Sequence, residues 1–243
     1  MKTLGIIPAR YQSTRFPGKP LIDIHGKTMI QRVYEQCLKS KSLHDVVVAT
    51  DDIRIENHCK EHQINYIMTS ENHINGTERC AEVSEKLGAS YDLIVNIQGD
   101  EPFIQPQAID EIVSIFEAHP ERKIGTLVKK MNDIGLKNQP SIIKCVLAGD
   151  KALYFSRSPI PFFREVSGEL GSFYKHIGMY AFRPQVLQEI VKLQPSPLEL
   201  AESLEQLRWL ENNYDIYVFK TDTEAISVDT PEDLHRILKL YPQ

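Results

Sequence analysis

The chain has 243 residues, 42% of them hydrophobic and 25% charged, and its 28 basic and 33 acidic side chains give a net charge of −5. This length and composition suit one large α/β domain with a sizeable core. The acidic balance excludes a global positive field that would recruit nucleic acid, so any anionic ligand needs a local cationic pocket.

Short β-branched runs alternate with helical patterns through the first hundred residues. The runs predict strands at Leu4–Ile7, Val46–Ala49, Ile64–Met68 and Leu93–Ile97, and their nearly unbroken apolar character indicates burial on both faces. Helical patterns lie between them, near residues 28–40, 52–62 and 77–88. This alternation predicts a parallel sheet with right-handed crossovers.

The second half begins with a helical pattern at Pro106–Glu117 and an extended one at Ile124–Lys129. Residues 142–182 then favour β and loop structure, with strand candidates at Ile142–Leu147, Ala152–Phe155 and Ile177–Phe182. We expect one domain over residues 1–243, with a smaller β-rich sub-lobe at about 142–182.

Two capping-box patterns mark helix starts near the C-terminus. In Ser196-Pro197-Leu198-Glu199 and in Thr230-Pro231-Glu232-Asp233, a hydroxyl residue precedes proline and a carboxylate follows three residues later. After the first box, Leu200, Leu204 and Leu207 form an apolar stripe at helical spacing.

The sequence shows neither a targeting or membrane-spanning segment nor a cysteine motif, and these absences bear on where the protein is located and whether its thiols are reduced. Only a short apolar run precedes Arg10, and no stretch approaches the roughly 18 apolar residues of a membrane span. The four cysteines form no CxxC pair and lie in no Cys/His cluster, which favours reduced thiols over a disulfide or zinc site. We therefore expect a cytoplasmic protein with neither nucleic acid nor membrane as a partner.

A cationic segment follows the first predicted strand. Residues 8–20 contain Arg10, Arg15 and Lys19 together with two hydroxyl side chains and a glycine, the combination that a triphosphate needs. A solvated basic loop is the alternative, although three prolines stiffen this segment. No P-loop, G-x-G-x-x-G or Asp-x-Asp pattern is present, which disfavours P-loop NTPases and dinucleotide oxidoreductases.

Two carboxylates stand where a metal ion could be held. Asp100 follows the buried run at residues 93–97 and therefore lies at the active edge of the sheet. Asp229 precedes the last capping box by one residue and is not needed for it. Mg²⁺ takes one or two protein carboxylates and fills its other positions with phosphate and water. A polar turn at Asp100 and an Asx turn at Asp229 explain the same residues without a metal.

These motifs together resemble the 3-deoxy-manno-octulosonate cytidylyltransferases, or CMP-Kdo synthetases. The resemblance begins with Pro-Ala-Arg-x-x-Ser-Thr-Arg-Phe-Pro-Gly-Lys-Pro-Leu at residues 8–21 and covers essentially the whole chain in the expected order. It continues through Ala49-Thr50-Asp51, Gly76-Thr77-Glu78-Arg79, Asn96-x-Gln98-Gly99-Asp100-Glu101-Pro102, Ala152–Arg157, His176-x-Gly178-x-Tyr180, Gln194–Glu199, Leu204–Arg208 and Val228–Asp233.

The resemblance implies an α/β fold of the Rossmann-like nucleotidyltransferase type. Its central sheet would be mostly parallel and flanked by helices, and its β-rich lobe would contribute to the sugar site and to a homodimer contact. It also implies roles for single residues. Arg10, Arg15 and Lys19 would grip the CTP phosphates, and Asp100 and Asp229 would hold Mg²⁺, with Lys19 and the two aspartates as the catalytic set. Ala9, Gly76, Thr77 and Arg79 would frame the nucleotide, and Gln98, Arg157, His176, Tyr180, Glu205 and Gln206 would surround the sugar acid.

The sugar-site residues have structural alternatives. His176 and Tyr180 share one face of a strand and could line the core, Glu205 and Gln206 could be solvated helix surface, and Arg157 could pair with any carboxylate. The segment at 162–174 follows no pattern that we can align, so the sugar could be Kdo itself or an amino-substituted relative.

The implied reaction transfers CMP from CTP to the anomeric hydroxyl of a 3-deoxy-octulosonate and releases pyrophosphate, for lipopolysaccharide inner-core synthesis. A metal-activated hydroxyl and a nearby carboxylate both stay open as the source of the base. Two alternative hypotheses are a CMP-activating enzyme for a sialate-like sugar acid and an inactive nucleotide-binding homologue.

Overall fold

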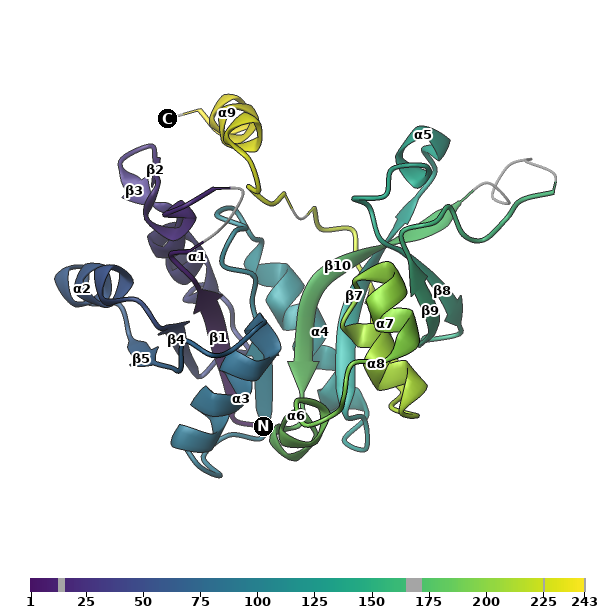
Figure 1. Cartoon of the computed structure of the whole chain (residues 1–243), viewed down its shortest axis with the longest axis horizontal. Coiled ribbons are helices and arrows are strands. Elements are labelled where there is room, and N and C mark those ends of the chain that lie inside the picture. The colour runs from purple at the N-terminus through teal and green to yellow at the C-terminus, as the bar shows by residue number, and fades with distance from the viewer. Residues whose placement is uncertain (13–15, 165–171, 225, 243) are drawn as a thin grey trace.

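The computed structural model describes residues 1–12, 16–164, 172–224 and 226–242. Within these ranges, nine strands form one sheet in the order β5-β4-β1-β6-β10-β7-β11-β9-β8, with helices packed around it (Figure 1). The strands of this sheet are β1 (Thr3–Ala9), β4 (Asp45–Thr50), β5 (Tyr66–Met68), β6 (Leu93–Asn96), β7 (Ile124–Met131), β8 (Lys144–Ala148), β9 (Lys151–Ser156), β10 (Phe173–Phe182) and β11 (Ile216–Lys220). A separate hairpin consists of β2 (Asp23–Ile24) and β3 (Lys27–Thr28).

The β5-β4-β1-β6 half of the sheet is parallel, which confirms the prediction from the strand–helix alternation. β10 then runs antiparallel between β6 and β7, so the sheet as a whole is mixed rather than mostly parallel. β8 and β9 form the far edge, inside the segment expected to be a β-rich sub-lobe. β11 pairs parallel with β7 and has no counterpart among the predicted strands.

Helices cover both faces of the sheet because successive side chains of each strand point to opposite faces. On one face, Ile7 of β1 packs with α1, α2 and α4, and on the other, Ile6 packs with α3, α6 and α8. The helices are η1 (Lys19–Leu21), α1 (Met29–Cys37), α2 (Ile53–Glu61), α3 (Gly76–Lys86), α4 (Pro106–Ala118), α5 (Ile134–Lys137), α6 (Pro184–Ile190), α7 (Pro197–Glu202), α8 (Gln206–Glu211) and α9 (Pro231–Leu240). None of the helices in the described ranges is long and apolar enough to cross a bilayer.

The last capping box forms as predicted. The Thr230 hydroxyl accepts the Asp233 N–H at 3.2 Å, and the Asp233 carboxylate accepts the Thr230 N–H at 3.1 Å. This reciprocal pair fixes where α9 begins.

The leucine stripe after Ser196 does not form one continuous helix, so that prediction is wrong. The chain leaves the helical conformation at Ser203, which has a left-handed φ of 51°, and restarts as α8. The break turns Leu204 into the core while Leu200 stays 68% exposed. An ion pair of 2.5 Å between Arg208 of α8 and Glu199 of α7 holds the two short helices together.

A small third core joins the two ends of the chain. Ile24 and Met29 from the N-terminal region pack with Val228 and Ile237 from the C-terminal region, all fully buried. In Figure 1, α9 accordingly lies beside the β2–β3 hairpin, over the end of the sheet toward which β1 points. We call this cluster, with the aromatic side chains packed on it, the third core.

Candidate active site

A cavity of about 560 Å³ opens at the carboxyl ends of β1 and β6, where ligands bind in open α/β sheets. Its walls come from the ends of these two strands, η1, the first turn of α3, β10 and the start of α8. The described residues that line it are Pro8, Ala9, Arg10, Gln12, Lys19, Pro20, Gly76, Thr77, Asn96, Gln98, Gly99, Asp100, Gly178, Tyr180 and Glu205.

The described ends of the cationic segment after β1 lie close together beside this cavity. Gly18 adopts a left-handed φ of 72°, and its N–H donates to the Tyr11 carbonyl at 2.9 Å, which brings Lys19 back beside the strand end. Arg10 also lines the cavity, where its guanidinium donates to the His73 carbonyl at 2.6 Å. Arg15, which the resemblance assigns to the phosphates, lies outside the described residues.

The two predicted metal ligands meet at one ammonium group. The Nζ atom of Lys19 lies 2.8 Å from Asp100 and 3.2 Å from Asp229, residues 81 and 210 positions away. Gly99 permits the close approach of this loop to β1, because a Cβ atom there would lie 2.7 Å from the Pro8 carbonyl oxygen. Three side chains from distant parts of the chain therefore converge at the cavity.

This arrangement fits a divalent cation by its donor chemistry. Both carboxylates contact one ammonium group, and both are partly exposed, with side-chain exposures of 25% for Asp100, which lines the cavity, and 36% for Asp229. Hard cations such as Mg²⁺ prefer carboxylate oxygens and complete their shell with water and phosphate. Lys19 pairs with both carboxylates, so a cation held by Asp100 and Asp229 would compete with its ammonium group.

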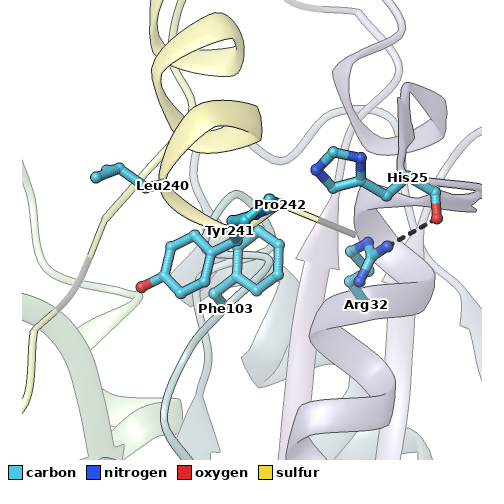
Figure 2. Close-up of a pocket in the computed structure, with 6 residues that line it drawn as sticks. All are labelled: His25, Arg32, Phe103, Leu240, Tyr241 and Pro242. Atoms are coloured by element: carbon cyan, nitrogen blue, oxygen red, sulfur yellow. Dashed lines mark hydrogen bonds between the residues drawn. The ribbon is translucent and has the colours of Figure 1, made fainter.

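The third core anchors the chain segments that carry these three residues. Phe103 follows the Asp100 loop and stacks on Tyr241 at the end of α9, with ring centroids 4.0 Å apart and planes 8° apart. Figure 2 shows this stack, together with Arg32 donating to the His25 carbonyl at 3.0 Å. The Arg32 guanidinium also lies over the Phe103 ring, 5.4 Å from its centroid. The helix that begins just after Asp229 is thereby fastened to the loop that carries Asp100.

The first turn of α3 forms the opposite wall. Gly76 and Thr77 line the cavity at this helix N-terminus, where backbone N–H groups favour negative charge. The carboxylate of Glu205 accepts hydrogen bonds from Thr77 Oγ1 at 2.8 Å and Asn75 Nδ2 at 3.0 Å. Burial raises the pKa of Glu205 to about 7, although the Thr77 hydrogen bond opposes the shift. Glu205 is thus a cavity residue and not solvated helix surface.

The β10 wall carries unsatisfied polar atoms. Gln98 donates to the Gly178 carbonyl at 2.9 Å. Within the described part of the chain, neither the Tyr180 hydroxyl nor the Asn96 Oδ1 atom has a hydrogen-bond partner, although both atoms are buried and both residues line the cavity. Buried polar groups normally find partners, so these two mark positions for ligand atoms. Asn96 is not among the residues that the sequence analysis assigned to the site. It could have been noticed, because it is the one polar residue in the otherwise apolar run at residues 93–97.

Glu101 follows Asp100 and is not among the described residues that line the cavity. Its side chain is 6% exposed, and burial together with the neighbouring Asp100 raises its pKa to about 8. A protonated carboxyl beside Asp100 adds no negative charge to the two carboxylates Asp100 and Asp229, which we call the acid pair.

The structure does not bring Arg79 or Arg157 to the cavity wall as the described residues define it. Arg79 is fully buried, pairs with Asp51 at 2.8 Å and donates to Thr69. Arg157 donates to the carbonyls of Pro140, Glu202 and Ser203. Direct contact of either arginine with a ligand stays a prediction, because each guanidinium would first have to give up these partners.

His176 and Gln206 also lie behind the wall. His176 shares a hydrogen bond of 3.0 Å with the Thr126 hydroxyl and packs on the edge of Phe155, and its ring lies 5.3 Å from that of Tyr180. Burial lowers the pKa of His176 to about 3, so the ring is neutral and offers no charge to a sugar carboxylate. Gln206 is buried in α8. The ligand contacts assigned to these two residues stay predictions.

Comparisons with known proteins agree with this geometry. A family model described as cytidylyltransferase matches residues 4–216. A 3-deoxy-manno-octulosonate cytidylyltransferase from Parabacteroides distasonis is 55% identical over 248 aligned positions, covering 98% of this chain and 97% of the relative. The enzyme of the same name from Geobacter sulfurreducens is 46% identical over 250 positions, covering 98% and 99%.

Solved structures give the same result. CMP:2-keto-3-deoxy-manno-octonic acid synthetase complexed with CTP superposes with a TM-score of 0.93 at 41% identity, covering 99% of this chain and 98% of that one. A cytidylyltransferase from Leptospira borgpetersenii, 18% identical with a TM-score of 0.66 over 100% and 89% of the two chains, shares the fold. The chain therefore belongs to the cytidylyltransferase family, and within it to the 3-deoxy-manno-octulosonate cytidylyltransferases.

Proposed function

We propose that the chain transfers CMP from CTP to the anomeric hydroxyl of 3-deoxy-manno-octulosonate and releases pyrophosphate. The observation that carries the proposal is the convergence of Lys19, Asp100 and Asp229 on one point of a large polar cavity. Two carboxylates and an ammonium group at a strand edge suit a metal-bound triphosphate. The activities for which the relatives are named supply the identity of the two substrates.

The nucleotide would occupy the side of the cavity formed by β1, η1 and α3. Arg10 and Lys19 are the described cations of the wall, and they would bind phosphate oxygens of CTP. Arg15 would join them from the same loop. Ala9 and the Gly76-Thr77 turn offer the backbone against which the cytosine ring would lie.

Mg²⁺ would be held by Asp100 and Asp229, and when bound it would neutralise charge on the phosphate oxygens. The ammonium group of Lys19 would then be available to the phosphates, where it would stabilise charge on the pyrophosphate leaving group. Positioning does the rest of the work, because phosphoryl transfer needs little covalent help from the protein.

The sugar acid would occupy the β10 side. The Tyr180 hydroxyl, the Asn96 oxygen and the Gln98 amide are polar atoms on this wall suited to sugar hydroxyls. Glu205 adds a carboxyl whose pKa is raised by burial to about 7. Arg157, His176 and Gln206 keep the roles that the resemblance implies only if the region around α7 and α8 rearranges on binding.

A homodimer and a cytoplasmic location complete the proposal. Phe162, Leu153 and Leu200 are 88%, 58% and 68% exposed in the β9–α7 region, and exposed apolar side chains of this size support a contact with a second copy. All four cysteines are free and buried, which supports a reducing compartment. The CMP-sugar would then serve lipopolysaccharide inner-core synthesis.

The test is pyrophosphate release by the purified chain on mixing with CTP, Mg²⁺ and 3-deoxy-manno-octulosonate. We expect release that needs all three, and at least about 10² times slower release by Asp229→Asn, because a charge contact to the reacting phosphates is lost. A nine-carbon sialate is the matched control substrate. Release with sialate in place of the octulosonate, or none with either, would overturn the assignment.

A further inference from the structure

Three side chains of metal-ligating type lie together at the C-terminal end of α2, and none of them lines the cavity. His58 and Glu61 belong to the last turns of the helix, and His62 is its C-cap residue. One ligand-type atom of each lies within 4.8 Å of the other two. Within the described part of the chain, this is the group of three such residues close enough to share an ion.

The two imidazole rings lie next to each other. Their centroids are 4.3 Å apart, with the planes tilted by 45°. Cys59, next to His58 in sequence, points into the core and is fully buried, so it does not compete for the same ion.

A hydroxyl group orients the His58 ring. The Thr28 Oγ1 atom lies 2.8 Å from His58 Nε2 and also accepts the Gln31 N–H at the start of α1. Metal-binding histidines usually donate their second ring N–H to an oxygen, which fixes the tautomer. In the tautomer that donates its Nε2 hydrogen to Thr28, the Nδ1 lone pair of His58 is left for a metal ion.

We propose that His58, Glu61 and His62 form a surface site for a divalent transition metal of the Zn²⁺ type, separate from the acid pair at the cavity. Two imidazoles and one carboxylate suit Zn²⁺ and disfavour Mg²⁺, which prefers oxygen ligands throughout. Tetrahedral bonds of about 2.1 Å place ligand atoms about 3.4 Å apart. Glu61 and His62 are exposed, so changes of rotamer can close the remaining gap. A fourth position stays for water.

The site lies next to the catalytic region without belonging to it. α2 packs against η1, the short helix that carries Lys19. Arg54 at the start of α2 lies over the Tyr11 ring, 3.3 Å from its centroid, in the loop before η1. Zinc at the far end of α2 would therefore be bound to the element that supports the cationic loop.

The test is isothermal titration calorimetry of the ligand-free chain with Zn²⁺ at neutral pH, in saturating Mg²⁺ so that the acid pair is already occupied. We expect one binding event, weakened at least about tenfold by His58→Gln or by His62→Gln and less by Glu61→Gln. His235→Gln removes an exposed histidine of α9 that belongs to no such group and is the matched control; it should leave the Zn²⁺ affinity unchanged.

Circular dichroism and cytidylyl transfer without zinc check that the variants fold. No Zn²⁺ binding by the wild-type chain under these conditions would overturn the proposal. So would equal affinity in the wild type and in the double variant His58→Gln/His62→Gln. A loss as large in His235→Gln as in His62→Gln would also overturn it, since the effect would then follow the number of histidines and not their position.

Discussion

The ammonium group of Lys19 occupies the carboxylates that would hold Mg²⁺, and this leads to an unusual expectation for Lys19→Met. Removing the ammonium group of Lys19 should weaken catalysis, because the phosphates of CTP lose a positively charged partner. The same change should strengthen Mg²⁺ binding to the ligand-free protein, because the metal no longer has to displace an ammonium group. The two effects have opposite signs and come from one side chain.

The magnitude follows from the two contacts, at 2.8 Å to Asp100 and 3.2 Å to Asp229. A hydrogen bond to a charged group contributes about 1.5–3 kcal/mol. Asp229 is 36% exposed, so solvent screening makes its contact the weaker one. We take about 1.5 kcal/mol as the net cost of displacing Lys19, which corresponds to about tenfold tighter Mg²⁺ binding in the variant. The loss in turnover should be about 10²-fold or more.

Calorimetric titration with Mg²⁺ in the absence of nucleotide measures the first effect, and pyrophosphate release measures the second. Lys27→Met is the matched control, because Lys27 makes a similar ion pair of 2.6 Å with Glu35 on the exposed hairpin side. The control should change neither quantity. Unchanged or weaker Mg²⁺ binding in Lys19→Met would refute the competition between lysine and metal.

Three further predictions concern the walls of the site. Tyr180→Phe should leave the free energy of unfolding within about 0.5 kcal/mol of wild type, because its hydroxyl has no partner in the described structure, while the KM for the octulosonate rises; urea unfolding and initial rates measure the two. The second prediction concerns Glu205, whose pKa in the folded chain is about 7 and therefore exceeds the ordinary value of 4.5. Between these two pH values the folded chain binds a proton that the unfolded chain has released. The free energy of unfolding therefore falls as the pH rises through this range. Glu205→Gln should reduce the pH dependence of stability by at most about 1.4 kcal/mol per pH unit in urea unfolding at pH 5 and pH 8, while the contribution of Glu101, whose pKa is also raised, stays. Tyr241→Ala should lower kcat more than it changes the KM for CTP, because it releases α9 from Phe103, whereas Leu240→Ala on the same turn should not.

Each of these three has an outcome that would contradict it. A large loss of stability in Tyr180→Phe would mean that the hydroxyl is bonded in the free protein. An unchanged pH slope in Glu205→Gln would place the proton on another group. Equal kcat in Tyr241→Ala and Leu240→Ala would show that the aromatic stack does not position Asp229.

Local patterns predicted much of the framework. We could predict β1, β4 and β6 because strands that are buried on both faces consist of nearly unbroken apolar runs. The start of α9 could be found because a capping box is a short-range signal. Arg10, Lys19 and Asp100 could be placed near the cavity for a related reason: they lie in the segments that follow β1 and β6, and the ends of parallel strands share an edge.

What could not be predicted depends on contacts between distant segments. The break at Ser203 follows from the packing of α8 on the sheet, and a leucine stripe at helical spacing contains no sign of it. β11 pairs with a strand about 90 residues earlier, and its short run does not reveal that partner. The commitment of Arg157 to three backbone carbonyls is likewise a matter of tertiary structure. The sequence shows that residue 157 is an arginine, but it does not show which groups the guanidinium contacts.

The third core also sets an order of assembly. Its members come from both termini, with Ile24 and Met29 at one end of the chain and Val228 and Ile237 at the other. As a chain grows from its N-terminus, β1, β4 and β6 can pair long before α9 exists. Asp229 reaches Asp100 only when the last helix has been made, so we expect nascent chains to hold a folded parallel half-sheet without a complete acid pair. Hydrogen exchange on a chain ending before Val228 would show this directly, as protection retained in β1 and lost from residues 16–29.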